Sequence, residues 1–322
     1  MKLNKAAMTV VIAALAVLIG ISAYKILHSG DEPEKKYVSV VVEESGDSRW
    51  TAFLQGLNQA ARDNHVILNV VSTGTFASME DEAAVLAREM EYGVDGIIVE
   101  PICDDTEGIL GDVLSGTQSV LVCTDVSGEK MQDNVSADGY RTGQMIADQI
   151  RSTEKITEDT EIGILSGNQE LPTVRSCLEG LLESLAVEEQ QIRWDISESG
   201  LSATANLLDL SMEAKPVDIL ISLDNKATEK AVDYLTAHSG VRCSLYGEGR
   251  SEKCIYNVDA GVIRALAVPD EYMMGYESLE RLSRKMTYFS TEQQAENIEV
   301  RMVTQENLHD QDTVWIAYPA VY

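Results

Sequence analysis

The chain alternates short apolar runs with longer amphipathic segments. The run at 36–43, "KYVSVVVE", is β-branched and almost continuous, which predicts a strand buried on both faces. The segment that follows, 49–63, spaces its apolar residues along one helical stripe. Further strands are predicted at 65–73, 94–101 and 118–126, and further helices at 78–92 and about 105–115. Such alternation is typical of a parallel sheet with helices on both faces.

The same alternation begins again after a helix predicted from Tyr140. Strands are predicted at 160–167, 191–197, 217–224 and 242–249, with helices at 171–186, about 202–214 and 226–238. Two such series in succession predict an α/β protein of two similar, doubly wound parallel-sheet lobes. The sequence has no long Gly/Ser linker between them, so we expect a close hinge.

The N-terminal segment differs from the rest of the chain. Residues 6–24 carry no charge and have about the length of one membrane span. Lys2 and Lys5 precede this run and acidic residues follow it from Asp31, so we expect the bulk of the chain outside the cell. We predict a transmembrane anchor over 1–27 and a polar tether over 28–36, giving a single-pass cell-membrane protein. A cleaved signal peptide is the alternative, although Ile21 stands where such cleavage sites have a small residue.

The composition narrows the choice of function. The net charge of -28, from 25 basic and 53 acidic residues, disfavours nucleic acid, which needs clustered Lys and Arg. The five cysteines have no C-x-x-C spacing and the four histidines are scattered, so no metal site and no cofactor are predicted. A disulfide between Cys243 and Cys254 is left open by the sequence. No catalytic motif is present, and the chain is not expected to be an enzyme.

Polar residues recur where the predicted strands end. The carboxyl ends of parallel strands form the ligand crevice in open α/β sheets. The residues placed there are Glu43, Glu100, Asp125, Asp138, Asp224, Asn225 and Glu248, and the helix starts add Arg49, Trp50 and Arg175. Carboxylates, guanidinium groups and an aromatic face suit a ring bearing several hydroxyls, such as a sugar. For any one carboxylate, a helix cap or a turn is the alternative role.

At these residues the chain resembles the type I periplasmic solute-binding proteins, the ribose-binding-like sugar receptors, over about 37–319. The stretches that carry the resemblance are "VSVVVEESGDSRWTAFLQGLNQAA", "VDGIIVEP", "SVLVCTDV", "VSADGYRTGQMIADQI", "ILSGNQELPTVRSCLEGLLESL" and "GVIRALAVPDEYMMGYESLERL". The resemblance implies two lobes joined by a three-strand hinge. It places 37–137 and about 270–298 in lobe 1, and 138–269 and about 299–322 in lobe 2.

The resemblance also implies roles for particular residues. Trp50 matches an aromatic that stacks on sugars, Asp125 a sugar-contacting aspartate, and Arg175 a ligand-binding arginine. Other ligand-binding positions fall on Asp47, Arg49, Glu100, Asp138, Asp224, Asn225 and Glu248.

The chain departs from the family pattern at several of these places. Arg49 replaces an aromatic residue, and Asp224-Asn225 reverses the usual Asn-Asp order. Glu248 stands for an aspartate, and Pro269 for a glutamine that binds ligand. These departures leave the identity of the ligand open.

The function that the resemblance implies is extracytoplasmic binding of a small sugar or sugar-like solute, and a monosaccharide is the ligand that we expect. Closure of the lobes would present it to an ABC transporter permease or to a membrane sensor kinase, between which the sequence does not decide. Two alternatives stay open: a carbohydrate-acting enzyme using Glu100 and Asp125 as paired carboxylates, and a structural module with a cleft that binds nothing.

Overall fold

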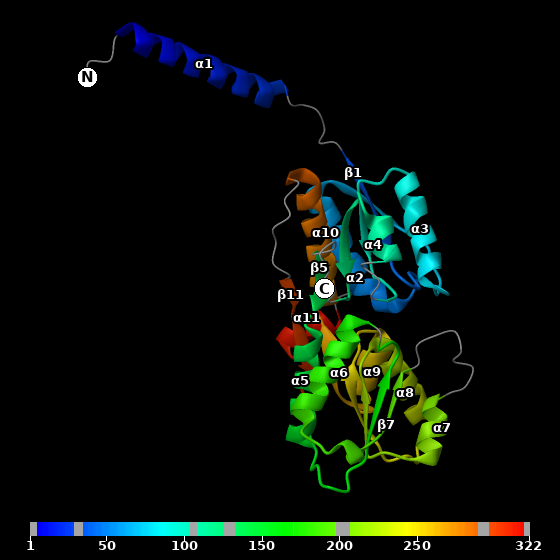
Figure 1. Cartoon of the computed structure of the whole chain (residues 1–322). Helices are drawn as coiled ribbons and strands as arrows, with labels where there is room; N and C mark the ends of the chain where they lie inside the picture. Colours follow the sequence, from blue (N-terminus) through cyan, green and yellow to red (C-terminus); the bar gives the residue numbers. More distant parts are fainter. Residues whose placement is uncertain are drawn as a thin grey trace. The chain divides into compact units, whose positions relative to one another are not determined.

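The computed structural model describes residues 5–28, 35–103, 108–124, 133–169, 171–197, 207–288 and 296–318. The chain divides into two compact units, Met1–Lys36 and Tyr37–Tyr322. In the first unit, Lys5–His28 form helix α1 (Figure 1). Within the ranges that the structure describes, no helix combines the length and the apolar character that a membrane span requires. The transmembrane part of the expected architecture is therefore not shown.

The second unit contains two six-stranded sheets of the same strand order. The first, the sheet of lobe 1, runs β11-β5-β4-β3-β1-β2. Its strands are β1 (Lys36–Val41), β2 (Val66–Val70), β3 (Gly96–Val99), β4 (Gln118–Val122), β5 (Asn134–Ala137) and β11 (Glu296–Ile298). Its helices are η1 (Ser48–Trp50), α2 (Thr51–Asn64), α3 (Met79–Glu91), α4 (Ile109–Leu114) and α10 (Glu271–Tyr288).

The second sheet, that of lobe 2, runs β12-β10-β9-β8-β6-β7. Its strands are β6 (Ile162–Ser166), β7 (Ile192–Ser197), β8 (Ile219–Ser222), β9 (Ser244–Glu248), β10 (Ile263–Pro269) and β12 (Val300–Val303). Its helices are α5 (Gly139–Thr153), α6 (Pro172–Leu185), η2 (Glu189–Gln191), α7 (Leu207–Ala214), α8 (Asn225–Ala237), α9 (Glu252–Asp259) and α11 (Gln311–Ala317). The pairing of β12 with β10 is antiparallel, whereas β6–β7, β6–β8, β8–β9 and β9–β10 are parallel.

Each sheet is buried on both faces, as its continuous apolar strands predict. In β1, Val40 packs with α2 and α10 on one face, whereas Val41 packs with α3 and α4 on the other. In lobe 2, Ile164 packs with α5 and α6, whereas Leu165 packs with α7, α8 and α9. The two-lobe α/β fold with parallel sheets is thus the one expected from the sequence.

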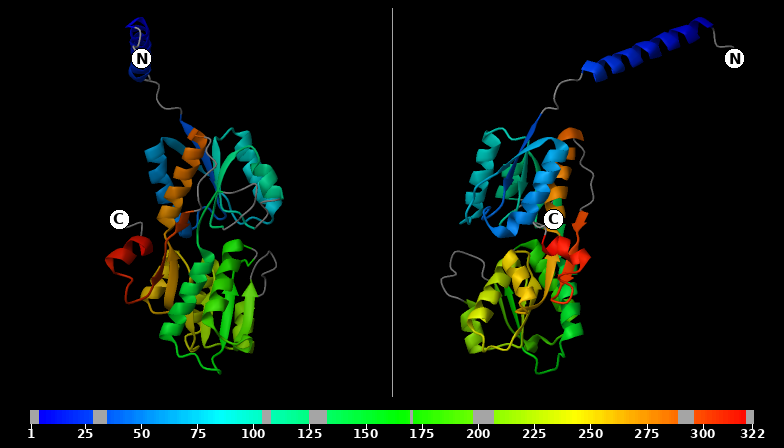
Figure 2. Two further views of the ribbon diagram at one scale, coloured as in Figure 1. Left: turned by 60° about the vertical axis from the view of Figure 1, so that its left-hand side comes forward. Right: turned by 180° about the vertical axis from the view of Figure 1, so that it is seen from behind.

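Each lobe contains one pair of helices in very close contact. Helices α2 and α10 lie side by side in lobe 1 (Figure 2), and α5 and α6 form the equivalent pair in lobe 2. Glycines stand at both contacts: a Cβ on Gly56 would lie 1.9 Å from the Tyr272 carbonyl oxygen, and one on Gly143 would lie 2.0 Å from that of Cys177. Backbone therefore meets backbone at these two places, which fixes the helices against their sheets.

The chain passes between the two sheets three times within the described ranges. The passages are at Asp138, between β5 and α5, at Asp270, between β10 and α10, and at Glu299, between β11 and β12. They lie at the ends of strands, so the carboxyl ends of both sheets face a common region. Cys243 and Cys254, whose pairing the sequence leaves open, are both free cysteines in this structure.

Candidate functional site

A cavity of about 600 Å³ lies where the carboxyl ends of the two sheets meet. Its walls include Glu43 after β1, Glu100 after β3, Asn168 after β6 and Asp224 after β8. These positions flank the point in each sheet where the strand order reverses, β1/β3 and β6/β8. That is the place where open α/β sheets bind their ligands.

The wall on lobe 1 is built around an ion pair between Arg49 and Glu100. The Asp47 carboxylate accepts the Arg49 backbone N–H at 2.9 Å and so caps the short helix η1. The Arg49 guanidinium donates to both carboxylate oxygens of Glu100, at 3.3 and 3.0 Å, and to the Glu43 carbonyl at 3.3 Å. The Arg49 side chain is only 6% exposed, so this bidentate ion pair is a fixed part of the cavity wall.

Trp50 lies behind this wall and not in it. Its side chain is 0% exposed and packs in the core, 5.3 Å from the ring of Phe53. The indole N–H donates to the Glu43 carbonyl at 3.0 Å, and the Arg49 guanidinium lies 4.2 Å from the ring centre. In this conformation Trp50 presents no exposed ring face on which a sugar could stack, because its side chain is buried and Arg49 lies over the ring.

Arg250 is the second guanidinium of the cavity, and it was missed in the sequence. It follows β9 by two residues and donates to Glu271 at 2.7 Å, with a second oxygen, that of Glu100, at 3.7 Å. Its Nη1 also lies 3.6 Å from the Cys123 sulfur. The sequence did contain a signal for Arg250, because it lies just beyond the end of a predicted strand. Only the first polar residue after that strand, Glu248, was considered as a site residue.

The wall on lobe 2 consists of Asp224, Asn225 and Glu248. The Asp224 carboxylate caps α8 by accepting the Ala227 N–H at 2.9 Å, and it also accepts the Gly167 N–H. The Asn225 side-chain oxygen accepts the N–H groups of Arg250 and Ser251, at 2.8 and 2.9 Å. Asn225 thus orders the turn that positions Arg250.

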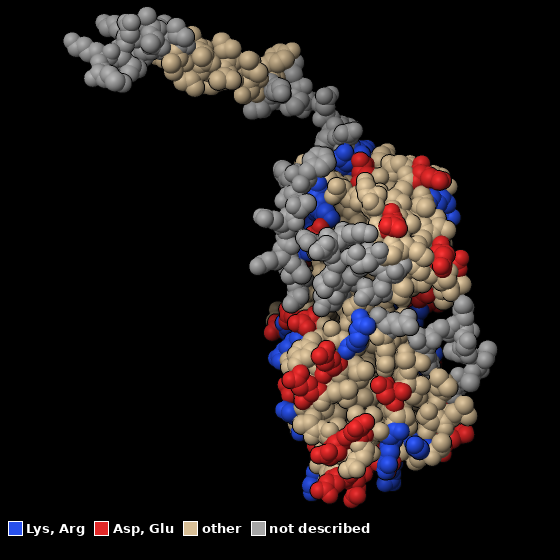
Figure 3. Space-filling model, viewed as in Figure 1, with Lys and Arg blue, Asp and Glu red and all other residues tan. Residues whose placement is uncertain are grey.

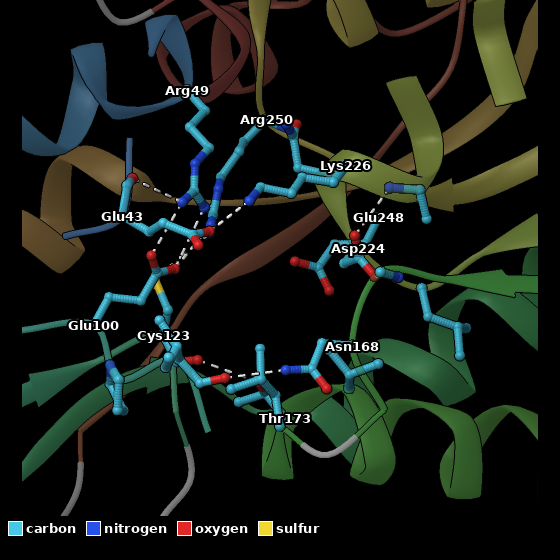
Figure 4. Close-up of a pocket in the computed structure, with 18 of the residues that line it drawn as sticks. Glu43, Arg49, Glu100, Cys123, Asn168, Thr173, Asp224, Lys226, Glu248 and Arg250 are labelled. Atoms are coloured by element: carbon cyan, nitrogen blue, oxygen red, sulfur yellow. Dashed lines mark hydrogen bonds and ion pairs between the residues drawn. The ribbon is translucent and has the colours of Figure 1, made fainter. Parts of the chain in front are cut away.

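Glu248 occupies the same wall in an unfavourable environment for a charge. The pKa of its carboxyl is raised to about 7, chiefly by burial and in smaller part by the nearby Asp224 and Glu271, whereas Arg250 lowers it. Figure 4 shows Asp224 and Glu248 on one side of the cavity, opposite Glu43 and Glu100.

Ion pairs and hydrogen bonds connect the two lobes around the cavity. Lys226 of α8 pairs with Glu43 at 2.5 Å and with Glu44 at 3.1 Å. The Asn168 amide donates to the Ile102 carbonyl at 3.0 Å, and the Thr173 hydroxyl donates to the Cys123 carbonyl at 3.2 Å. The lobes are therefore close together in this conformation (Figure 4).

Besides Trp50, three sequence-predicted site residues do not line the cavity. Arg175 is exposed on α6, whereas its neighbours Thr173 and Val174 form the cavity wall. Asp138 caps α5 by accepting the Arg141 N–H at 2.9 Å. Asp47 caps η1, as described above. The cap role that was the alternative for single carboxylates applies to these two aspartates.

The remaining predicted residues are placed as follows. Arg49, Glu100, Asp224, Asn225 and Glu248 are brought together in the cavity walls. Asp125 lies outside the described residues. Pro269, at the end of β10, lines the cavity as well, where its ring offers no hydrogen bond from the side chain.

Glu82 is a buried acid immediately behind the site. Its side chain is 0% exposed on α3, and one of its oxygens accepts the Ile102 N–H at 3.2 Å. Burial raises the pKa of this carboxyl to about 8, and Glu100 and Glu43 add to the rise while the Ile102 N–H opposes it. The folded protein therefore holds a proton on Glu82 that the unfolded chain releases at neutral pH.

We expect Glu82→Gln to remove a pH dependence of stability. Because the folded-state pKa lies above the ordinary value of 4.5, the free energy of unfolding of the wild type falls as the pH rises from about 4.5 to 8. The variant should match the wild type at pH 5 and exceed it by about 2 to 4 kcal/mol at pH 8.5. Urea denaturation at the two pH values measures this, with Glu91→Gln on the exposed end of α3 as the control. Parallel pH profiles for Glu82→Gln and wild type would contradict the assignment.

With the geometry described, the chain can be compared with known proteins. The family model described as "Periplasmic binding protein domain" matches residues 38–287. The chain belongs to the periplasmic binding protein family. This confirms the type I resemblance found in the sequence. It also agrees with the expectation that the chain is no enzyme, since this is a family of binding proteins. Comparison with curated proteins finds no match to the sequence.

Solved structures with the same fold include several solute-binding proteins. A carbohydrate transporter solute binding protein from Agrobacterium radiobacter, in complex with D-arabinose, is 15% identical with a TM-score of 0.77, covering 89% of this chain and 100% of that chain. A glucose-galactose binding protein from Geobacillus stearothermophilus is 18% identical with a TM-score of 0.73, covering 86% and 99%. The periplasmic component of an ABC-type sugar transport system from Hahella chejuensis is 20% identical with a TM-score of 0.73, covering 83% and 99%.

Proposed function

We propose that this periplasmic binding protein binds a small sugar or sugar-like solute in the cavity between its lobes and presents it to an ABC transporter. The observation that carries the proposal is the cavity itself, about 600 Å³ in volume and lined from both lobes at the strand ends. A volume in this range suits a small solute. The structural neighbours support the choice of solute, since their names describe proteins of sugar transport.

The side chains of the cavity are suited to hydroxyl recognition. Carboxylates accept hydrogen bonds from hydroxyl groups, and the amide of Asn168 can both donate and accept. Glu100 and Asp224 are already oriented by their own partners, Arg49 and the backbone N–H groups. Groups fixed in this way lose little conformational entropy when a ligand binds.

A glycosidase is less well supported. Both oxygens of Glu100 accept hydrogen bonds from Arg49, so neither is placed to protonate a glycosidic oxygen as a general acid must. The other carboxylate of that hypothesis, Asp125, lies outside the described residues.

The manner of attachment and the membrane partner belong to the proposal as well. The uncharged run at 6–24 favours an anchor at the cell membrane, with the two lobes on the outer side. A sensor kinase is the second partner that such an anchored receptor would suit. Membrane fractionation of cells expressing the full-length chain tests the anchor: we expect the protein in the membrane fraction after a high-salt wash, and release into the soluble fraction would contradict it.

Binding can be tested by thermal unfolding of the full-length protein with D-arabinose, D-ribose, D-glucose, D-galactose and myo-inositol. A ligand at 100 times its Kd stabilises the folded state by about 2.7 kcal/mol, so at least one of these should raise the Tm by roughly 5 °C or more. Thr173→Trp fills the cavity from its wall and should abolish the rise. Thr287→Trp, on the exposed surface of α10, should keep it. The proposal fails if no solute stabilises the wild type, or if Thr173→Trp retains the full response.

A further inference from the structure

Among the described residues, three of the four cations that line the cavity are paired with carboxylates. Arg49 is paired with Glu100, and Arg250 with Glu271. Lys226 is paired with Glu43 and Glu44. Lys230, one turn further along α8, also lines the cavity and has interactions of its own. At Arg49, Lys226 or Arg250, an anionic solute would have to displace an existing pair, which costs the acid its partner in a partly buried place.

In the lobe 2 wall, by contrast, no ion pair within the described part of the chain joins Asp224 or Glu248 to a cation. The Asp224 carboxylate is held by two backbone N–H groups, those of Ala227 and Gly167. The Glu248 carboxylate accepts no hydrogen bond from any residue that the structure describes, whereas its backbone carbonyl accepts the Thr228 hydroxyl. Glu248 is partly buried at the cavity surface, and a carboxylate in such a place gains from a ligand that supplies a hydrogen-bond donor.

The surroundings of Glu248 show which kind of partner is missing. The charged groups that act on it are Arg250, which lowers its pKa, and Asp224 and Glu271, which raise it. Cys177 of α6 faces the same region, and burial keeps the pKa of its thiol well above the ordinary value. Arg250 lies nearer to Glu271, at 2.7 Å, and is shared with Glu100. One positive charge at this wall would therefore complete the pairing.

We propose that the solute carries a protonated amine, as an amino sugar or an amino-polyol does, and that Asp224 and Glu248 are its counter-ions. This inference rests on the proposed function, because it assigns a chemical class to the solute of the same cavity. The hydroxyl groups of such a solute are bound by the remaining polar residues of the walls. The ammonium group donates its hydrogen bonds to the two carboxylates, which attract it by charge as well.

Calorimetric titration of the full-length protein with matched pairs of probes tests the inference. The pairs are D-glucosamine with D-glucose and D-galactosamine with D-galactose, and N-acetyl-D-glucosamine serves as the neutral form of the amine. We expect at least one amine to bind roughly 10- to 100-fold more tightly than its neutral partner. Glu248→Gln and Asp224→Asn should each remove most of that preference. Asn caps helices as well as Asp does, so Asp224→Asn is expected to fold.

As controls, the same Asp→Asn and Glu→Gln substitutions are made at residues outside the cavity. Asp218→Asn alters an exposed carboxylate that accepts the Glu161 N–H at 3.0 Å, and Glu179→Gln alters an exposed acid on α6. Both should retain the amine preference. If neutral sugars bind as tightly as the amines, or more tightly, the inference is overturned while the proposed function stands. If neither amines nor any neutral sugar bind, both are overturned.

Discussion

Replacing Arg250 with methionine is expected to lower the free energy of unfolding by about 3 to 5 kcal/mol at pH 8. The guanidinium is only 10% exposed, and it is the partner of Glu271, whose side chain is 4% exposed. Without Arg250 the Glu271 carboxylate would be buried beside Glu100 with no cation in direct contact. Removing one member of a buried pair costs far more than the pair itself contributes, since an uncompensated charge remains.

The loss should be smaller at low pH. Burial already raises the pKa of Glu271, while Arg250 lowers it by its charge and its hydrogen bond. Without Arg250 this pKa rises further, so Glu271 takes up a proton and the destabilisation declines as the pH falls towards 5. Urea denaturation at pH 5 and pH 8 measures both values.

Two further variants sharpen the test of Arg250. The double variant Arg250→Met/Glu271→Gln should recover part of the stability, because the buried charge is removed together with its partner. Arg151→Met removes an exposed arginine, paired with Asp148 at 3.1 Å, and should cost less than about 1 kcal/mol. Equal losses for Arg250→Met and Arg151→Met would show that the cavity pair is not structural.

The second large effect is expected at the glycines of the helix pairs. Gly56→Ala and Gly143→Ala should each lower the free energy of unfolding by about 3 kcal/mol. Alanine favours a helix by about 1 kcal/mol over glycine, but here its Cβ would lie 1.9 and 2.0 Å from a carbonyl oxygen of the neighbouring helix. The helices would have to separate, since backbone cannot move aside as a side chain can.

Gly240→Ala is the control for the helix pairs, because a Cβ there meets nothing within 4 Å. We expect its free energy of unfolding to lie within about 0.5 kcal/mol of the wild type. Chemical denaturation of the three variants gives the comparison. Gly56→Ala or Gly143→Ala as stable as Gly240→Ala would mean that the helices do not pack as closely as described.

The fold could be predicted because its signals are periodic and local. Continuous β-branched runs such as that of β1 have few alternatives to a strand buried on both faces, and their alternation with amphipathic helices leaves few topologies. The antiparallel strand β12 has no such signal, because its direction depends on how the chain returns from lobe 1. The helix predicted near 202–214 begins at Leu207 in the structure, and its earlier residues lie outside the described ranges.

The site could be predicted where a residue directly follows a strand, as Glu100 and Asp224 do. It could not be predicted where the rotation of a side chain decides its role. On α6, Val174, Cys177 and Leu181 form the buried stripe, so Arg175 is turned away from the cavity and Thr173 lies at its edge. The apolar spacing of this stripe is visible in the sequence and would have predicted an exposed Arg175. The ligand-binding role of Arg175 was predicted from the family resemblance instead. At η1, the position of the Arg49 guanidinium over Trp50 depends on its partner Glu100, which is 51 residues further along the chain.

The overall excess of acidic residues is explained by the protein surface and not by the residues that line the cavity. On the face shown in Figure 3, acidic side chains are spread over the surface with isolated Lys and Arg among them, and no broad basic patch is visible. The surface charge is typical of a soluble exterior. The cavity combines four acids with four basic residues in its lining: Glu43, Glu100, Asp224 and Glu248 with Arg49, Lys226, Lys230 and Arg250. Two of these acids, Glu100 and Glu43, form ion pairs with Arg49 and Lys226, so the charges in the cavity do not merely reflect the overall excess of acids.

The most direct test is a crystal structure of the full-length protein with the solute that gives the largest rise in Tm. We expect electron density for the solute between the two lobes, with polar contacts to Asp224 and Glu248 on one side and to the Arg49–Glu100 wall on the other. Density for the solute at any other surface, with the space between these walls filled only by water, would contradict the central claim.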